Sequence, residues 1–180
     1  MALSVQQRHD WDDARRFVAC IAVVVGAGTV LAGAYGFQYI GGYIPCELCL
    51  QQRIPYFVGI PLAAFGVLIN FRTGTGPDLL TKAVLYLLAC VFAVSALFGL
   101  YHAGVEWGFW PGPATCAAGA QEASITTDGL LTALETTTPP SCSDATFRAL
   151  RLSFAGWNAV ASAAFVAISL WGARADVRRA

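Results

Sequence analysis

Residues 17–40 read FVACIAVVVGAGTVLAGAYGFQYI and contain no Asp, Glu, Lys or Arg. A helix needs about 20 apolar residues, and at least about 17, to cross a hydrocarbon core of about 30 Å. Three further stretches, residues 54–70, 83–105 and 152–172, are also free of these four charged residue types. The pattern therefore predicts four transmembrane helices.

The composition agrees with a lipid environment. Of the 180 residues, 57% are hydrophobic and 12% are charged, whereas soluble domains carry about 25% charged residues. The formal net charge is zero, which gives no indication of a nucleic-acid partner. We expect an all-α membrane protein, a four-helix transmembrane bundle that forms one integral membrane domain over residues 1–180.

A cleaved signal peptide is the alternative interpretation of the first apolar segment. Its apolar run is longer than the ~7–15 residues of a signal peptide, and Asp12 and Asp13 interrupt the basic region before it. A retained first helix is therefore expected.

Basic residues predict the orientation of the bundle. Of the 11 Lys and Arg residues, eight lie in the two termini and in the connection between the second and third segments: Arg8, Arg15, Arg16, Arg72, Lys82, Arg174, Arg178 and Arg179. Short loops rich in Lys and Arg stay in the cytoplasm. We therefore expect both termini to be cytoplasmic and the loops at residues 41–53 and 106–151 to lie on the outer face.

Two of the six cysteines, Cys20 and Cys90, lie within apolar segments, where a thiol usually acts as a small hydrophobic group. The other four all lie in the two outer loops: Cys46, Cys49, Cys116 and Cys142. An even set of cysteines facing an oxidising compartment indicates disulfides. Four cysteines allow three connectivities.

The second outer loop is long for a chain of this size. The stretch SITTDGLLTALE at residues 124–135 predicts a short helix on the bilayer surface. Ser143 or Asp144 is a suitable N-cap for the helix that leads into the fourth span. Cys116 follows a stretch with two prolines and two glycines, and Cys142 follows two prolines. Such pliable backbone suits thiol exchange, in which sulfurs must approach one another in turn.

The first outer loop carries the C-x-x-C pair, Cys46 and Cys49. If the second helix begins at this pair, its free N–H groups and dipole lower the pKa of a thiol there. Arg53 follows Cys49 by four residues and would share its helix face. His102 ends the third apolar segment at a similar depth. Arg53 and His102 together would donate hydrogen bonds to the carbonyl oxygens of a lipophilic quinone.

Each of these two residues also has a structural interpretation. Arg53 could anchor the helix end at the membrane surface by extending its charge towards water. His102 could be an ordinary hydrogen-bonded residue at a helix end.

These motifs resemble a known family. Cys46-Glu-Leu-Cys49 followed by Gln52-Arg53, with a two-cysteine loop after the third of four spans, is similar to the disulfide bond formation protein B (DsbB) family. The PATC around Cys116 and LSFAGWN at residues 152–158 are also similar to family members. The resemblance implies a quinone-dependent thiol oxidase of the bacterial inner membrane, with its redox loops in the periplasm. Such a protein reoxidises a thioredoxin-fold dithiol oxidase (DsbA or a similar protein) and passes the electrons to ubiquinone or menaquinone.

The resemblance also implies a role for each outer cysteine. It pairs Cys46 with Cys49 and Cys116 with Cys142 as redox-active disulfides. The partner would attack at Cys116, the released Cys142 would engage Cys46, and Cys49 would remain as a thiolate facing the quinone. Arg53 would polarise the quinone, with the histidine nearby. The chain has no glycine fingerprint of nicotinamide or flavin proteins, so a membrane-dissolved acceptor is expected.

Three rival interpretations are weaker. A structural or adapter tetraspan protein with two stapling disulfides would have disulfides of low potential, but a C-x-x-C ring is a poor staple. A four-cysteine zinc site requires a second closely spaced pair, which Cys116 and Cys142 do not form, so no metal is expected. The vitamin K epoxide reductase-like family places its loop cysteines before the C-x-x-C, and here the order is reversed.

Overall fold

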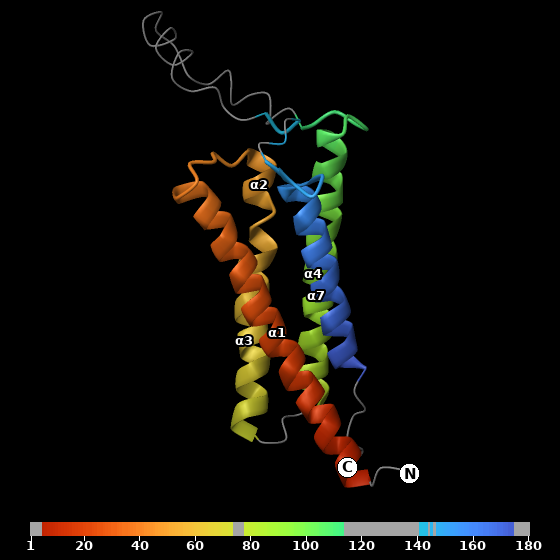
Figure 1. The fold of residues 1–180 in the computed structure, drawn as a ribbon. Coiled ribbons are helices and arrows are strands. Elements are labelled where there is room, and N and C mark those ends of the chain that lie inside the picture. Colours follow the sequence, from red (N-terminus) through yellow and green to blue (C-terminus); the bar gives the residue numbers. More distant parts are fainter. Residues whose placement is uncertain (1–4, 74–77, 114–140, 144, 146, 175–180) are drawn as a thin grey trace, which may run out of the picture.

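The computed structural model describes residues 5–73, 78–113, 141–143, 145 and 147–174. Its helices are α1 (Val5–Tyr39), α2 (Glu47–Gln51), α3 (Ile54–Thr73), α4 (Asp78–Glu106) and α7 (Phe154–Ala173) (Figure 1). Within the described ranges, four helical spans are long and apolar enough to cross a membrane, with α2 and α3 counted together as one. The predicted four-helix membrane bundle is therefore confirmed.

The helices extend beyond the apolar segments that predicted them. The first begins at Val5, upstream of the predicted boundary at residue 17. Ion pairs between residues one turn apart support this polar extension: Arg15 lies 3.6 Å from Asp12, and Arg16 lies 3.4 Å from Asp13. Hydropathy gives the part of a helix that lies in lipid, whereas the helix itself continues until its hydrogen bonds are interrupted.

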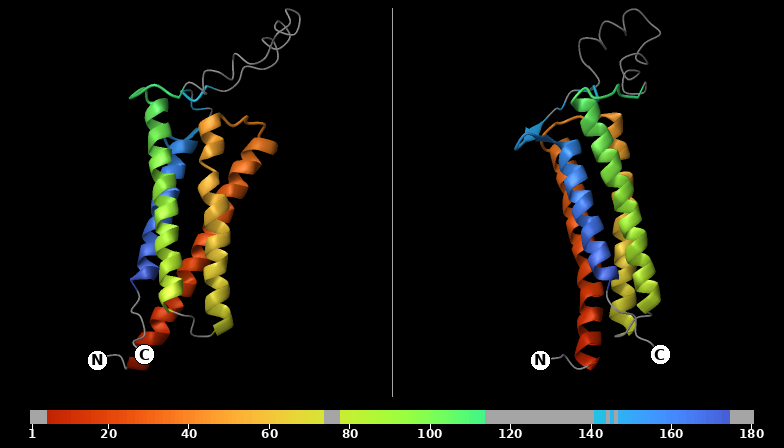
Figure 2. Two further views of the ribbon diagram at one scale, coloured as in Figure 1. Left: turned by 180° about the vertical axis from the view of Figure 1, so that it is seen from behind. Right: turned by 90° about the vertical axis from the view of Figure 1, so that its right-hand side faces the viewer.

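The bundle is built from two helix pairs. Helix α4 packs along α7, and α1 packs on α3; α1 runs obliquely to the others (Figures 1 and 2). The start of α1 and the end of α7 lie at one end of the bundle. Helix α2 and the end of α4 lie at the other (Figure 1). This arrangement brings the first outer loop to the same end as the segment that precedes α7.

The interior of the bundle combines aromatic rings with small residues. Phe92 and Phe165 pack with ring centroids 4.9 Å apart, and Tyr56 meets Phe92 edge-on at 5.6 Å. Helices α4 and α7 approach closely at Gly99, where an added Cβ would lie 2.8 Å from the backbone nitrogen of Ala159. Small residues allow such close approach between membrane helices.

A two-residue turn precedes the last helix. Strands β1 (Arg148–Ala149) and β2 (Leu152–Ser153) pair antiparallel, with Arg148 opposite Ser153. Leu150 and Arg151 between them both have positive φ, 52° and 67°. Positive φ at both central positions is the conformation of a tight hairpin turn whose twist matches that of the strands.

Helix α7 coincides closely with the predicted fourth span at residues 152–172, but no helix leads into that span among the described residues from Ser143 onward. Ser153 is the N-cap of α7, and its side chain accepts a hydrogen bond from the backbone N–H of Gly156 at 3.2 Å. The prediction of an N-cap at Ser143 or Asp144 was wrong, because the chain first forms the hairpin. The surface helix predicted at residues 124–135 lies outside the described residues, as does Cys116.

Candidate functional site

The C-x-x-C pair lies at the start of α2, as predicted. Cys46 is the N-cap, with φ −73° and ψ 170°, and its sulfur accepts the backbone N–H of Cys49 at 3.4 Å. The backbone oxygen of Cys46 accepts the N–H of Leu50 at 3.1 Å, which closes the first turn. The sulfur of Cys46 is thus directed at free backbone N–H groups.

A break separates this turn from the helix that follows. Helix α2 ends at Gln51, and α3 begins at Ile54. Pro55 has no N–H to donate to the carbonyl of Gln51, so the hydrogen-bond ladder is interrupted there. Cys49 and Arg53 therefore do not share one continuous helix, as their spacing had suggested, although both face the same cavity.

The cysteines differ in redox state in this structure. Cys46 and Cys49 are free, with their sulfurs 2.9 Å apart, compared with about 2.05 Å in a disulfide. The pair is therefore a dithiol joined by a hydrogen bond. Cys142 is disulfide-bonded, and Cys116, its predicted partner, lies outside the described residues.

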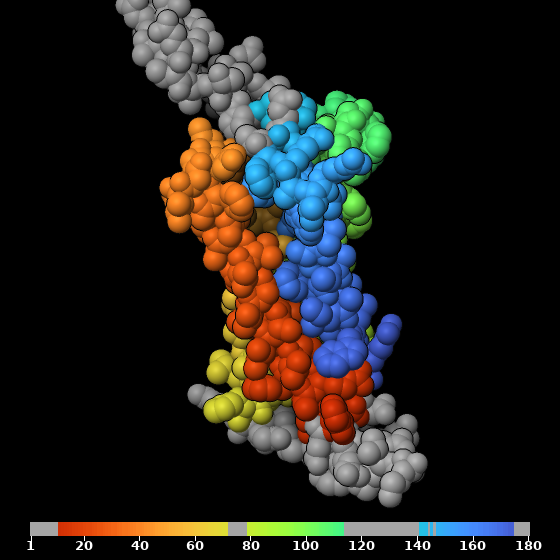
Figure 3. Space-filling view, in the orientation of Figure 1, coloured from red at the N-terminus to blue at the C-terminus, as the bar shows by residue number. Residues whose placement is uncertain are grey.

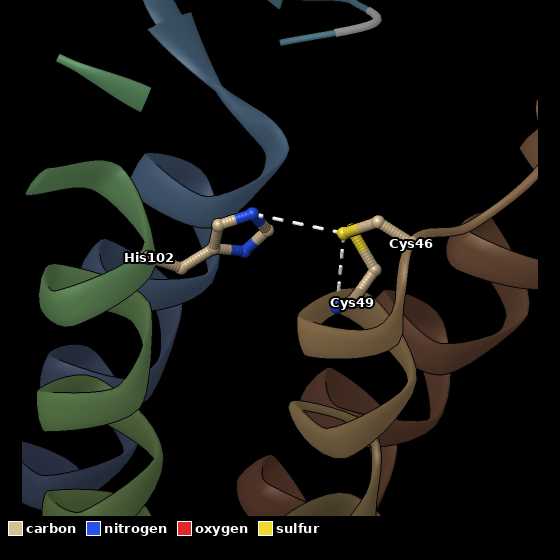
Figure 4. Close-up of side chains that lie close together, drawn as sticks. All are labelled: Cys46, Cys49 and His102. Carbon is tan, nitrogen blue, oxygen red and sulfur yellow. Dashed lines mark hydrogen bonds between the residues drawn. The ribbon is translucent and has the colours of Figure 1, made fainter. Parts of the chain in front are cut away.

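His102 of α4 faces Cys46 across the gap between the helices (Figure 4). Its Nε2 lies 3.7 Å from Sγ of Cys46 and 3.8 Å from Oε1 of Glu106. The side-chain amide of Gln52 donates a hydrogen bond to Nδ1 at 2.6 Å. Because Nδ1 accepts this bond, the proton of the neutral ring is on Nε2, towards the sulfur and the carboxylate.

These contacts favour a thiolate at Cys46. The hydrogen bond from the Cys49 thiol lowers the pKa of the Cys46 thiol most strongly. Burial acts in the opposite direction, while hydrogen bonds from His102 and from the backbone N–H of Cys49 lower the pKa further. The net result is a pKa well below that of an ordinary cysteine, which makes Cys46 a ready nucleophile or leaving group.

Cys46 also lies close to the second outer loop. It belongs to a buried cluster with Leu48, Val105 and Cys142, against which Cys49 packs. Cys46 is 8% exposed and Cys142 is 2% exposed. The structure thus brings together cysteines that are far apart in the sequence and that come from the two predicted redox loops.

A cavity of about 410 Å³ opens on the other side of the C-x-x-C, within the range of small-molecule sites. It lies between α1, the α2–α3 break, the hairpin and α7, where Figure 3 shows the surface hollowed between the orange end of α1 and the blue chain. Its walls are mainly aromatic and aliphatic. Its polar side chains include Gln38, Cys49, Arg53, Tyr56 and Asn158.

Arg53 is fixed at this cavity by contacts with α1. Its Nη1 donates a hydrogen bond to Oε1 of Gln38 at 2.6 Å, and its guanidinium stacks 4.8 Å from the ring centroid of Tyr35. His102 is not among the residues that line the cavity. The structure therefore does not bring Arg53 and His102 together, because His102 faces Cys46 instead.

A buried polar network extends from the cavity into the bundle. The hydroxyl of Tyr56 donates to Oδ1 of Asn158 at 2.7 Å and lies 3.3 Å from Oγ of Ser162. Ser162 in turn donates to Oγ of Ser95 at 2.9 Å. The network joins α3, α4 and α7 below the C-x-x-C.

Sequence reasoning missed several residues of this site. Gln52 belongs to the recognised motif, but no role was expected for it. Glu106 follows His102 by four residues, and that spacing on one helix face could have indicated the contact. Gln38 contacts Arg53 between helices, and nothing in the spacing of the two residues indicates it.

Comparison with known proteins gives the family. Residues 15–172 match the sequence model described as "Disulfide bond formation protein DsbB". The chain is also 31% identical, over 88 residues, to "Uncharacterized protein RP370" of Rickettsia prowazekii (strain Madrid E). That match spans 49% of this chain and 46% of the relative, so the chain spans about half the length of that protein. No solved structure matches the chain.

Proposed function

The chain belongs to the family of disulfide bond formation protein DsbB, and on that premise we propose that it is a thiol:quinone oxidoreductase. Family membership and the four apolar spans support a multi-pass membrane oxidoreductase of disulfide bond formation. In the proposed reaction it reoxidises a DsbA-like, thioredoxin-fold dithiol oxidase and reduces ubiquinone or menaquinone of the membrane pool.

The main support for this proposal is that the two sulfurs of the C-x-x-C, 2.9 Å apart, contact different parts of the molecule. Cys46 is part of a buried cluster with Cys142, whereas Cys49 packs at the edge of that cluster and also lines the apolar cavity. A disulfide between Cys46 and Cys49 would therefore connect a thiol-exchange site with a ligand site.

The proposed thiol relay begins at the second outer loop. The partner's dithiol reduces the disulfide between Cys116 and Cys142. The thiolate of Cys142 then attacks Sγ of Cys46, which breaks the Cys46–Cys49 bond and leaves Cys49 as a thiolate at the cavity. The thiol of Cys116 then attacks Sγ of Cys142, which restores the second-loop disulfide and releases Cys46, so that the C-x-x-C becomes a dithiol. Each partner dithiol thus delivers two electrons and two protons to the C-x-x-C, and the partner leaves as a disulfide.

The cavity fits a lipophilic quinone by the chemistry of its walls. A bound quinone supplies an acceptor for two electrons and two protons. Arg53, held by Gln38 and Tyr35, places a fixed positive charge at a mainly apolar site. That charge stabilises negative charge at the cavity, on the Cys49 thiolate or on a ligand oxygen.

The proposed location is the bacterial inner membrane, with both termini in the cytoplasm and the redox loops in the periplasm. The distribution of Lys and Arg supports this orientation. The end of the bundle that carries the start of α1 and the end of α7 is opposite the C-x-x-C (Figure 1), so one orientation is consistent with both features.

The test uses the purified full chain in detergent, a reduced thioredoxin-fold dithiol oxidase and a soluble ubiquinone analogue. Quinone absorbance and partner thiols are followed together. We expect one quinone reduced per dithiol oxidised, and no turnover in Cys49→Ser or Cys116→Ser. Cys90→Ser is the matched control, because this free cysteine lies on the exposed surface of α4, and it should keep full activity.

Two results would contradict the proposal. A single stoichiometric oxidation of the partner without quinone loss would mean that the disulfides exchange but that the acceptor is another molecule. No change in either signal would favour a structural membrane protein with stapling disulfides.

A further inference from the structure

The C-x-x-C and His102 place three ligand atoms of metal-binding residues close together. The two sulfurs and a ring nitrogen of His102 all lie within 4.8 Å of one another. They come from two separate elements, the first turn of α2 and the end of α4 (Figure 4). We propose that, as a dithiol, the C-x-x-C binds a thiophilic divalent cation such as Zn²⁺ together with His102, and that this ion blocks reoxidation.

The distances suit a tetrahedral ion after one small adjustment. With Zn–S near 2.3 Å and Zn–N near 2.0–2.1 Å, a nitrogen and a sulfur on one ion lie about 3.5 Å apart. Nε2 of His102 and Sγ of Cys46 are 3.7 Å apart. Two sulfurs on one ion lie about 3.8 Å apart, compared with 2.9 Å here. Rotation of the Cys49 side chain about its Cα–Cβ bond can provide this separation.

The second ring nitrogen of His102 already has a buried hydrogen-bond partner that can orient the ring. Metal-bound histidines almost always use their other nitrogen in a hydrogen bond, which fixes the orientation of the ring. Here Nδ1 accepts the side-chain amide of Gln52 at 2.6 Å. Gln52 is 7% exposed and His102 is 2% exposed. Nε2 is directed at the sulfurs. It becomes a ligand when the ring proton moves to Nδ1, which can then donate to the amide oxygen of Gln52 after a half-turn of that amide.

A buried carboxylate next to the site points independently to a cation. The side chain of Glu106 is 5% exposed, and its Oε1 lies 3.8 Å from Nε2 of His102. Its Oε2 is buried and makes no hydrogen bond to any part of the chain that the structure describes. A buried carboxylate oxygen without a partner is costly. A cation held by Cys46, Cys49 and His102 would compensate that charge.

This set of ligands differs from the four-cysteine site that the sequence excluded, and it is gated by redox state. A disulfide offers no thiolate, so the ion binds only the dithiol form. While it is bound, neither Cys46 nor Cys49 can form a disulfide. Inhibition of turnover rests on the proposed function, whereas binding of the ion does not.

Binding is tested without quinone or partner. The full chain carries Cys116→Ser and Cys142→Ser, so that only the C-x-x-C remains of the outer cysteines. After reduction with a phosphine, Cd²⁺ is added and its sulfur-to-metal charge-transfer band is followed. We expect one Cd²⁺ per chain, displaced by Zn²⁺, and no band in Cys46→Ser or Cys49→Ser. Cys90→Ser should bind as before.

Substitutions at His102 and its neighbours distinguish a preformed metal site from metal binding by the two thiols alone. We expect His102→Ala to weaken binding by at least tenfold, and Gln52→Ala to weaken it about 10- to 100-fold. Glu106→Gln keeps the size of the side chain and removes its charge, and it should also weaken binding. The absence of a band, or equal affinity in all three variants, would overturn the proposal.

The inhibitory consequence has its own measurement. Zn²⁺ should stop quinone reduction by the unmodified chain, and a chelator should restore it. If Cd²⁺ binds to a chain that has no oxidase activity, the proposed function fails and the metal site stands. If turnover continues at Zn²⁺ concentrations that saturate the dithiol, the proposed block is wrong.

Discussion

Sγ of Cys46 and Sγ of Cys49 lie 2.9 Å apart, yet the two side chains face different parts of the molecule. Cys46 is buried beside His102 and Cys142, and Cys49 lines the cavity that also holds Arg53. The division follows from the position of the motif, which has His102 of α4 on one side and the cavity beside α1 and α7 on the other. Each thiol therefore has its own chemistry, and the two can be tested separately.

The thiol of Cys46 should stay reactive at pH values where ordinary cysteines are protonated. Its pKa is lowered by the hydrogen bond from Cys49 and further by His102. An ordinary thiol, with a pKa near 8.5, loses about tenfold in thiolate for each pH unit below that value. In the reduced protein, the rate of Cys46 alkylation by iodoacetamide, followed by mass spectrometry, should therefore fall much less between pH 7 and pH 6.

Two variants test the cause of this reactivity. Cys49→Ala removes the strongest influence that lowers the pKa of Cys46, so alkylation should become steeply pH-dependent. His102→Ala should shift the pH profile in the same direction by a smaller amount. A flat profile in both variants would mean that neither contact sets the pKa.

Substitution of Arg53 should weaken quinone use and leave thiol exchange intact. A hydrogen bond to a charged group contributes about 1.5–3 kcal/mol, so Arg53→Gln should raise KM for a soluble quinone analogue roughly 10- to 100-fold. Arg53→Lys keeps the charge but loses the planar group that stacks on Tyr35, and we expect an intermediate KM. Arg151→Gln, at the exposed hairpin turn, is the control.

A measurement of the first turnover alone separates thiol exchange from quinone reduction. Stopped-flow oxidation of the partner by the resting disulfides should proceed at the unmodified rate in Arg53→Gln, because Arg53 lies on the cavity side. Loss of that first oxidation would place Arg53 in thiol exchange.

The sequence predicted the spans because a lipid environment leaves few alternatives. Backbone groups in a bilayer must be paired within the chain, so long apolar runs without charge become helices. The position of the C-x-x-C at a helix start was also predictable, from the loop that precedes a span. Both properties depend on residues that are close in the sequence.

The direction in which side chains on separate helices face was not predictable in the same way. Arg53 and His102 were expected to act together because they end spans at a similar depth, but depth does not specify which way a side chain faces. The break at Pro55 turns Arg53 towards Gln38 of α1, and His102 faces Cys46. The hairpin before α7 was missed because Leu150 and Arg151, both with positive φ, are not residues typical of that turn.

Close packing between α4 and α7 should make Gly99 intolerant of a side chain. A Cβ there would lie 2.8 Å from the nitrogen of Ala159 and 3.0 Å from the backbone oxygen of Ala155, so the helices would have to separate. We expect Gly99→Ala to lower the free energy of unfolding in detergent by about 1–3 kcal/mol. Gly28→Ala, with nothing within 4 Å of its Cβ, should be neutral or stabilising. Equal effects at both sites would contradict this packing.

The buried network around Tyr56 should show energetic coupling. Tyr56→Phe removes the hydroxyl that forms hydrogen bonds with Asn158 and Ser162. Hydrogen bonds between membrane helices contribute about 0.6 kcal/mol on average and up to about 1.7 kcal/mol. A double-mutant cycle of Tyr56→Phe with Ser162→Ala, followed by unfolding in detergent, should give a coupling energy of at least about 0.5 kcal/mol. Additive effects would show that the contact contributes nothing to stability.

The division between the two thiols makes a direct prediction about crosslinking. In Cys49→Ser combined with Cys116→Ser, the remaining outer thiols are Cys46 and Cys142, which share one buried cluster. A mild oxidant should close a Cys46–Cys142 disulfide, detected by peptide mapping.

The matched control is Cys46→Ser combined with Cys116→Ser, which leaves Cys49 and Cys142. Its disulfide should close at least tenfold more slowly, because Cys49 lines the cavity and only borders the buried cluster that contains Cys142. Equal rates would mean that the second loop reaches both sulfurs alike. Faster closure at Cys49 would reverse the proposed order, with Cys49 receiving the partner's electrons and Cys46 passing them on.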